Sequence, residues 1–125
     1  MDVKTCIPLL NVENVPSSIQ YYGDLLGFEV AAQAEYGGGV RWARIQRGEF
    51  SLMLNQPDDA DSSQRRERSN YSDAVFYFDV EDAQQSHGEC KARNYPVSDI
   101  SHEEYGWEFF IRDPDGYVLG FTDTK

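Results

Sequence analysis

The alternation of hydrophobic and polar positions divides the chain into two similar halves, of which the first begins with an apolar strand over 6–11. Asn14-Val15-Pro16 then marks the start of a helix, and Gly27 marks its end. Short apolar runs at 28–30, 40–45 and 50–54 predict three more strands, the last two as a β-hairpin around Arg47-Gly48. Apolar residues three and four apart predict the buried face of the helix: Ile19, Tyr22, Leu25 and Leu26.

The second half repeats this order of elements. It begins with a strand over 74–80, and Asp82 can cap a helix that runs to about Arg93. Strands are predicted over 97–100, 105–112 and 117–122. Asp113-Pro-Asp-Gly116 predicts a tight turn between the last two, because proline presets φ and glycine accepts a positive φ.

A shift of 68 positions places the two halves on one another. Ile7–Asn14 falls on Val75–Asp82, Trp42–Arg44 falls on Phe110–Arg112, and Gly48 falls on Gly116. A repeat of this length predicts two copies of one supersecondary unit. We therefore predict an α+β fold in a single domain over 1–125, with one βαβββ module at about 1–56 and a second at about 74–125. The linker at about 57–73 is charged, has no apolar period and is predicted to be loop-like or partly disordered.

The charge of the chain narrows the choice of partners. The formal net charge is −11 and the pI is near 4.4, so nucleic acid and anionic membrane surfaces are not expected partners. An acidic field favours cationic ligands, although it can equally serve solubility alone. No long apolar run predicts a membrane helix, and no secretion signal is recognised, so we expect a cytoplasmic protein. Cys6 and Cys90 are expected to be reduced, buried thiols.

Several aromatic residues on predicted strands could form flat walls around a planar or cationic ligand. Ordinary core packing is the alternative, and for Trp42 and Phe109 we consider it the stronger one. Tyr36, next to Gly37-Gly-Gly39, could close over a ligand or be an exposed loop tyrosine. The candidate aromatic residues are Trp42, Tyr77, Tyr105, Trp107 and Phe109.

The polar candidates are histidines and glutamates. His102 precedes an aromatic strand and could contact a ligand or act as a general base, or it could be a surface residue. His87 lies on a polar helix and is predicted to be exposed. Four glutamates could surround a cationic ligand or form a solvated acidic surface: Glu35, Glu103, Glu104 and Glu108. The sequence shows neither a nucleophilic triad nor a phosphate-binding loop.

Two passages resemble the vicinal-oxygen-chelate superfamily, which includes glyoxalase I, extradiol dioxygenases, fosfomycin-modifying enzymes and bleomycin-resistance proteins. They are Ile7–Phe28 and Trp107–Gly116, joined by Val80-Glu-Asp82. The resemblance implies two βαβββ modules that form a curved mixed sheet around a cleft. It also implies a homodimer.

The same resemblance locates a metal site. Metal-using members place ligands on the first and last strands of each module, and the matching positions here are Ile7, Leu52, Val75 and Gly120. None of these side chains can bind a metal ion. We therefore predict no metal and no cofactor, and we retain Leu52 and Val75 as positions that line the ligand cleft.

Among the members of the superfamily, the chain is similar in character to the bleomycin-resistance proteins. Cys6–Leu10 carries a proline in the arm that those proteins exchange between subunits, and Glu104–Phe109 places Tyr105 where they carry a cleft aromatic. The resemblance implies metal-free binding and sequestration of an aromatic or cationic, antibiotic-like compound by a homodimer. Two alternatives remain open: a lyase, isomerase or dioxygenase of the glyoxalase type, and an accessory or immunity module whose partner is another protein.

Overall fold

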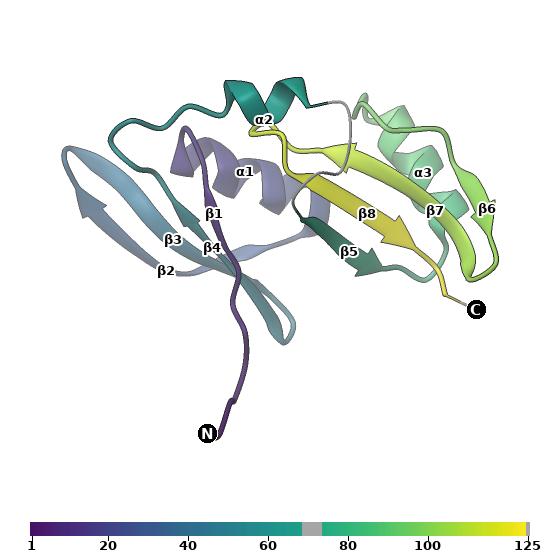
Figure 1. Cartoon of the computed structure of the whole chain (residues 1–125), viewed down its shortest axis with the longest axis horizontal. Helices are drawn as coiled ribbons and strands as arrows, with labels where there is room; N and C mark the ends of the chain where they lie inside the picture. Colours follow the sequence, from purple (N-terminus) through teal and green to yellow (C-terminus); the bar gives the residue numbers. More distant parts are fainter. Residues whose placement is uncertain (69–73, 125) are drawn as a thin grey trace. The chain divides into compact units, whose positions relative to one another are not determined.

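The computed structural model describes residues 1–68 and 74–124 and contains two compact units, Met1–Ser62 and Ser63–Lys125 (Figure 1). The linker prediction for 69–73 lies outside the described residues.

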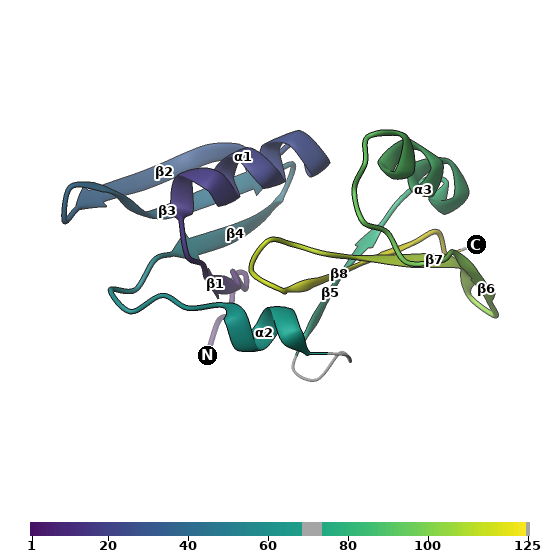
Figure 2. The same ribbon diagram turned by 90° about the horizontal axis from the view of Figure 1, so that it is seen from above.

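The first unit is a four-stranded sheet with a helix on one face. The strands lie in the order β1 (Leu9–Asn11), β4 (Phe50–Asn55), β3 (Gly39–Arg47) and β2 (Glu29–Tyr36). β1 and β4 are parallel, and the other neighbours are antiparallel. α1 (Val15–Leu26) packs on β3 and β4 (Figure 2).

The second unit has the same topology. Its strands lie in the order β5 (Val75–Asp79), β8 (Val118–Thr122), β7 (Gly106–Arg112) and β6 (Ser101–Glu103). α3 (Ala83–Ala92) packs on β7, and a short helix, α2 (Ser63–Glu67), precedes the sheet. The predicted α+β class with two βαβββ modules is therefore confirmed.

The two long helices begin in the same way in both units. The Asn14 side chain accepts a hydrogen bond from the Ser17 amide at 2.8 Å, and the Asp82 side chain accepts one from the Gln85 amide at 3.0 Å. These caps satisfy N–H groups that have no partner within the helix. Gly27 ends α1 with φ 74°, a left-handed conformation that suits glycine.

A second shared contact joins the start of each helix to the end of the last strand. Gln56 Oε1 accepts a hydrogen bond from the Val15 amide at 3.0 Å, and Asp123 Oδ2 accepts one from the Ala83 amide at 2.8 Å. Asp123 Oδ1 also accepts from the Trp107 amide at 2.9 Å. The internal repeat thus extends to individual hydrogen bonds.

Strand register corrects the repeat alignment in detail. Leu9 pairs with Met53 on β4, and Tyr77, its counterpart in the second unit, pairs with Gly120 on β8. Gly120 therefore corresponds to Met53, one residue beyond the Leu52 that a fixed shift of 68 predicts. By the same pairings, Phe110 corresponds to Arg44 instead of Trp42.

Each core lies between the sheet and its helix. In the second unit, Phe121 stacks on Phe78 and Phe109 with ring centroids 5.6 and 4.9 Å apart. The Phe109 ring meets His87 of α3 edge-on at 5.1 Å. The face of each sheet that points away from the helix is named the open face. The first open face contains Leu9, Asn11, Trp42, Arg44, Met53 and Asn55. The second open face contains Tyr77, Asp79, Glu108, Phe110, Gly120 and Thr122.

Some predicted elements differ from the structure in extent. β1 begins at Leu9 instead of Cys6, after Pro8, which has no N–H to donate to a ladder. β2 reaches Tyr36 because it pairs with β3 over its length, although all of its residues are exposed. Instead of a strand over 97–100, Val97 makes an isolated bridge to Ile111, and the strand that pairs with β7 is β6. The expected loop at 57–73 contains α2.

Two predictions of burial were wrong. Cys6 is exposed because it precedes the first strand, whereas Cys90 is half-buried on α3 and burial raises the pKa of its thiol. His87 is half-buried instead of exposed, because its Nε2 lies 2.8 Å from the Ser98 carbonyl oxygen and its ring packs on Phe109. No helix within 1–68 or 74–124 is long and apolar enough to cross a membrane.

Candidate functional site

The centre of the second open face is a glycine flanked by two aromatic rings. Gly120 on β8 pairs with Tyr77 on β5 and with Phe110 on β7. A Cβ atom on Gly120 would lie 2.8 Å from the Tyr77 ring and 3.2 Å from the Phe110 ring, so both rings lean into the space above the glycine. The two rings meet edge-on with their centroids 6.0 Å apart. The glycine therefore allows an aromatic surface to form across three strands.

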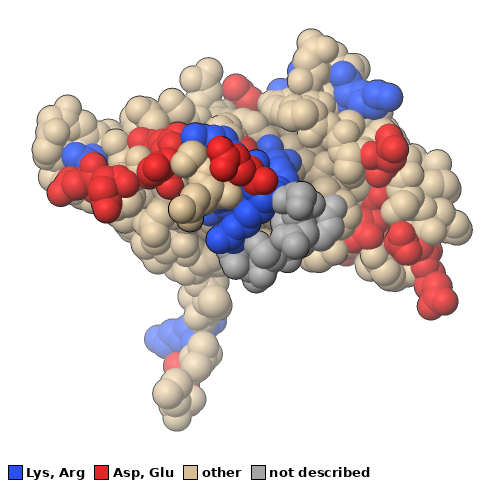
Figure 3. Space-filling view, turned by 45° about the horizontal axis from the view of Figure 1, so that its top comes forward, with Lys and Arg blue, Asp and Glu red and all other residues tan. Residues whose placement is uncertain are grey.

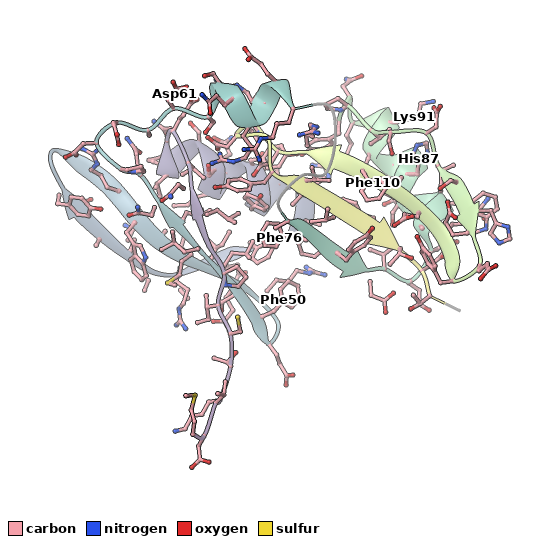
Figure 4. All side chains as sticks on the ribbon, in the orientation of Figure 1. Phe50, Asp61, Phe76, His87, Lys91 and Phe110 are labelled. Carbon is pink, nitrogen blue, oxygen red and sulfur yellow. The ribbon has the colours of Figure 1, made fainter. Side chains whose placement is uncertain are left out.

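Much of this aromatic surface is accessible. Tyr77 is 55% exposed and Tyr105, in the turn before β7, is 46% exposed, while Phe110 is half-buried (Figure 4 labels Phe110 on β7). Large aromatic side chains usually bury most of their area, and exposed ones that gather on one face are typical of binding surfaces. The rings of this face can therefore stack on a flat organic molecule.

A buried carboxylate lies next to these rings. Glu108 is only 6% exposed, and its Oε2 accepts a 2.5 Å hydrogen bond from the Tyr105 hydroxyl. This hydrogen bond, followed by desolvation and the charges of Glu108 and Glu103, raises the pKa of Tyr105 to about 12. Tyr105 therefore remains protonated and holds the carboxylate in place at neutral pH.

Two polar atoms next to this hydrogen bond have no hydrogen-bond partner within the described chain. They are Glu108 Oε1 and the hydroxyl oxygen of Thr122, both shielded from solvent. Glu108 and Thr122 are directly opposite one another on β7 and β8. Such unpaired buried groups are uncommon in native proteins, and each one requires a physical explanation.

The charge of this end of the second open face is negative. Asp79 lies opposite Thr122 on β5, and Glu103 on β6 lies opposite Gly106, two residues before Glu108 on β7. Among the described strand residues of this face, Arg112 is the only basic one, and its guanidinium donates to the Gly116 carbonyl at the other end of β7. On the face drawn in Figure 3, acidic side chains form several patches and basic ones gather over α2. The geometry at Glu108 thus favours cationic groups over anionic ones.

The position that would carry a metal ligand on the last strand does not fit a metal ion. Gly120 has no donor atom, and the rings of Tyr77 and Phe110 fill the space that a side chain there would take. Among residues 1–68 and 74–124, no group of three or more His, Cys, Asp or Glu side chains could hold a metal ion. The nearby polar groups, Glu108 and Thr122, each offer a buried oxygen that can accept a hydrogen bond.

The structure separates the sequence-predicted site residues of the second unit onto two faces. Val75, Tyr77 and Tyr105 contribute to the second open face, since Val75 lies two residues before Tyr77 on β5. Phe109 and Trp107 lie on the alternate positions of β7, on the side of α3, where Phe109 is fully buried. Trp107 is half-buried and stacks on the exposed ring of His102 at 4.6 Å.

The remaining predicted residues belong to the first unit. Tyr36, at the end of β2, is 49% exposed, and the Arg41 guanidinium lies over its ring. Trp42 is half-buried on the first open face, opposite Asn55. Leu52 is a core residue, so the open-face position that we assigned to Leu52 is held by Met53. The error follows from the one-residue difference in register described above.

Phe110 and Thr122 were missed as site residues, and Glu108 was identified only as one of several acidic candidates. The sequence contains one signal that would have found Thr122, namely Gly120 as an open-face position. Every second residue of β8 from Gly120 shares its face, which includes Thr122. Phe110 and Glu108 require the register between β7 and β8, which sequence alternation alone does not provide.

Comparison with known families and structures agrees with the fold. The family model described as "Glyoxalase/Bleomycin resistance protein/Dioxygenase superfamily" matches residues 6–121. No curated protein sequence matches the chain at a significant level.

Three solved structures are similar over nearly the whole chain. The bleomycin-binding protein from bleomycin-producing Streptomyces verticillus, complexed with copper(II)-bleomycin, is 21% identical with a TM-score of 0.69, covering 100% of this chain and 99% of its own. The bleomycin resistance determinant encoded on transposon Tn5 is 17% identical with a TM-score of 0.70, covering 98% and 99%. A glyoxalase family protein from Enterococcus faecalis is 17% identical with a TM-score of 0.78, covering 96% and 97%. At these identities the similarity establishes the fold alone.

Proposed function

Because the chain belongs to the Glyoxalase/Bleomycin resistance protein/Dioxygenase superfamily, we propose that it binds and sequesters a flat, cationic small molecule on the second open face. The observation that carries this proposal is the arrangement around Gly120, where accessible rings lie next to a buried carboxylate. Aromatic faces attract cations and stack on planar groups, and burial of their apolar area supplies affinity.

The comparisons support an antibiotic as the class of ligand. Two of the similar structures are described as a bleomycin-binding protein and a bleomycin resistance determinant. The acidic chain, with a formal net charge of −11, suits cationic compounds of this kind. We further propose that the protein acts as a homodimer in the cytoplasm, without a metal or cofactor, and protects by holding the compound instead of converting it.

Calorimetric titration with bleomycin, run beside elemental analysis of the purified protein, tests this proposal. We expect saturable binding by protein that contains no stoichiometric metal. Tyr77→Ala should weaken binding by about 1–3 kcal/mol, because it removes a central aromatic contact. Tyr36→Ala is the matched control, since Tyr36 is similarly exposed but belongs to the first unit. Bound divalent metal with no binding of bleomycin would contradict the proposal.

A second candidate function is an enzyme of the glyoxalase type, and Glu108 is the observation that favours it. A buried carboxylate with one oxygen held by a tyrosine and the other unpaired can accept a proton from a substrate. Incubation of the metal-stripped protein with the hemithioacetal of methylglyoxal and glutathione separates the two functions. Turnover that Glu108→Gln abolishes would establish the enzyme, and no turnover alongside tight bleomycin binding would establish sequestration.

A further inference from the structure

The unpaired atoms beneath the aromatic surface indicate which chemical group the ligand presents. Glu108 is 6% exposed and Thr122 is 8% exposed, so both are more than nine-tenths buried. Their free oxygens belong to directly opposed residues of neighbouring strands, which brings the two side chains to the same place on the second open face. One oxygen is charged and can only accept hydrogen bonds, and the other can accept or donate.

Leaving such a pair unsatisfied is unfavourable for the free protein. A buried carboxylate oxygen loses its hydration, and only one side of this carboxylate is compensated, by the hydroxyl of Tyr105. A valine in place of Thr122 would have the same shape without an unpaired hydroxyl. The polar pair is therefore explained if a bound molecule supplies the missing donor.

The surroundings determine which donor fits. Asp79 lies opposite Thr122 on β5, Glu103 lies on β6 opposite Gly106, two residues before Glu108, and the exposed rings of Tyr77 and Tyr105 lie on the same face. An anionic group would be repelled here, whereas an N–H group that carries positive charge gains from the carboxylate and from the rings.

We propose that Glu108 Oε1 and the Thr122 hydroxyl bind a protonated nitrogen of the ligand, an ammonium, amidinium or guanidinium group that donates hydrogen bonds to both. This inference rests on the proposed function, and it adds that the ligand must carry N–H donors as well as charge. The Tyr105 hydroxyl holds the other carboxylate oxygen, so Tyr105 is a positioning residue for Glu108. Glu108 Oε1 is shielded from solvent in the free protein, so the side chains around it must move when the ligand enters.

Three flat probes of nearly equal size separate charge from hydrogen bonding. An aminoacridinium carries charge and N–H donors, an N-methylacridinium carries charge without N–H donors, and acridine at mildly alkaline pH carries neither. We expect the full-length protein to bind them in that order of decreasing affinity, measured by fluorescence titration. Glu108→Gln should reduce the affinity for the aminoacridinium about ten- to a hundredfold and leave acridine unchanged, because a charge-assisted hydrogen bond is lost.

Two variants make this comparison specific. Glu104→Gln removes the same charge from a neighbouring exposed position, so it should change every affinity less than twofold. Thr122→Val removes the hydroxyl without changing the shape of the side chain, and it should weaken only the aminoacridinium, severalfold. It also provides the test if Glu108→Gln fails to fold.

The outcomes distinguish this inference from the proposed function. If no probe binds, or if binding does not depend on Tyr77, the binding proposal itself fails. If all three probes bind through Tyr77 with equal affinity, and neither Glu108→Gln nor Thr122→Val changes any of these affinities, the aromatic site is real. The unpaired oxygens are then filled by water only, and the inference is overturned.

Discussion

The two open faces have the same strand topology but differ in how the polar side chains at their strand ends are hydrogen-bonded. On the first open face, the Asn55 amide donates to Asn11 at 3.1 Å, so the polar pair at the strand ends is satisfied within the chain. At the matching place on the second, Thr122 lies opposite Asp79 and Glu108, and two buried oxygens have no hydrogen-bond partner among the described residues. This difference is the basis for the proposal that the second open face binds a ligand.

The matched positions at the centre of each face also differ, and the residues of the second face suit a cationic aromatic ligand better. Met53 and Arg44 on the first open face correspond to Gly120 and Phe110 on the second. A methionine fills the place where the second sheet has a glycine and two converging rings. The first open face also presents a cation, which opposes the binding of a positively charged compound.

The largest expected difference in the free energy of unfolding is between variants of two neighbouring residues on opposite faces of β7. Phe109→Ala should lower the free energy of unfolding by roughly 3–5 kcal/mol, because it leaves a cavity in the ring stack between Phe121 and His87. Phe110→Ala, at a half-buried position, should lower it by about 1 kcal/mol while it weakens ligand binding. Urea unfolding of both variants measures the contrast, and equal losses would contradict the assignment of the two faces.

The next largest effect on stability is expected from the hydrogen bonds that join the start of each helix to the end of the last strand. Asp123→Ala removes a buried carboxylate that accepts from two amides, Ala83 and Trp107, and should cost roughly 2–4 kcal/mol of stability. Gln56→Ala removes one accepted amide hydrogen bond and should cost about 1 kcal/mol. Thermal or urea unfolding of the pair provides the measurement. A larger loss of stability in Gln56→Ala than in Asp123→Ala would contradict this account of the two contacts.

Removal of the exposed rings should affect binding more than stability. Tyr77→Ala is expected to leave the unfolding midpoint nearly unchanged, because more than half of the side chain is exposed. Its affinity for bleomycin should fall by roughly 1–3 kcal/mol, whereas Trp42→Ala on the first open face should leave affinity unchanged. Equal losses of affinity in the two variants would remove the distinction between the faces.

The smallest effect is the ionisation of Tyr105. Its folded-state pKa of about 12 lies above the ordinary value of 10.0, so its contribution to stability is complete below pH 10.0 and is lost as the pH rises toward about 12. Ultraviolet titration should show a tyrosine ionising near pH 12 that is absent in Tyr105→Phe. Glu108→Gln should return this ionisation toward its ordinary value, and no change in that variant would contradict the hydrogen bond as its cause.

The sequence predicted the fold well because its signals are local. Apolar spacing located α1, and Asn14, Gly27 and Asp82 marked helix ends by their capping chemistry. The repeat predicted the shared topology, and Tyr77 and Tyr105 were identified as candidates for the site. β6, however, is the polar Ser101–Glu103, which becomes a strand only by pairing with β7.

The site itself was predicted less completely because faces depend on register. Tyr105, Trp107 and Phe109 were candidates on a strand predicted over 105–112, but in the structure Gly106 starts the strand with φ 138°, so Tyr105 lies outside its alternation. As a result Tyr105 reaches Glu108, three residues away, instead of lying with Phe109. Leu52 was taken for Met53 for a related reason, since a single-residue slip moves a side chain to the other face of a strand.

Mapping the amide signals of the isotope-labelled protein by nuclear magnetic resonance, during titration with the aminoacridinium, tests the central claim most directly. We predict that signals of Tyr77, Phe110 and Gly120 shift in a saturable manner, while those of Leu9, Arg44 and Met53 do not move. Shifts confined to the first open face, or none at all at saturating probe, would contradict the proposal that the second open face binds the ligand.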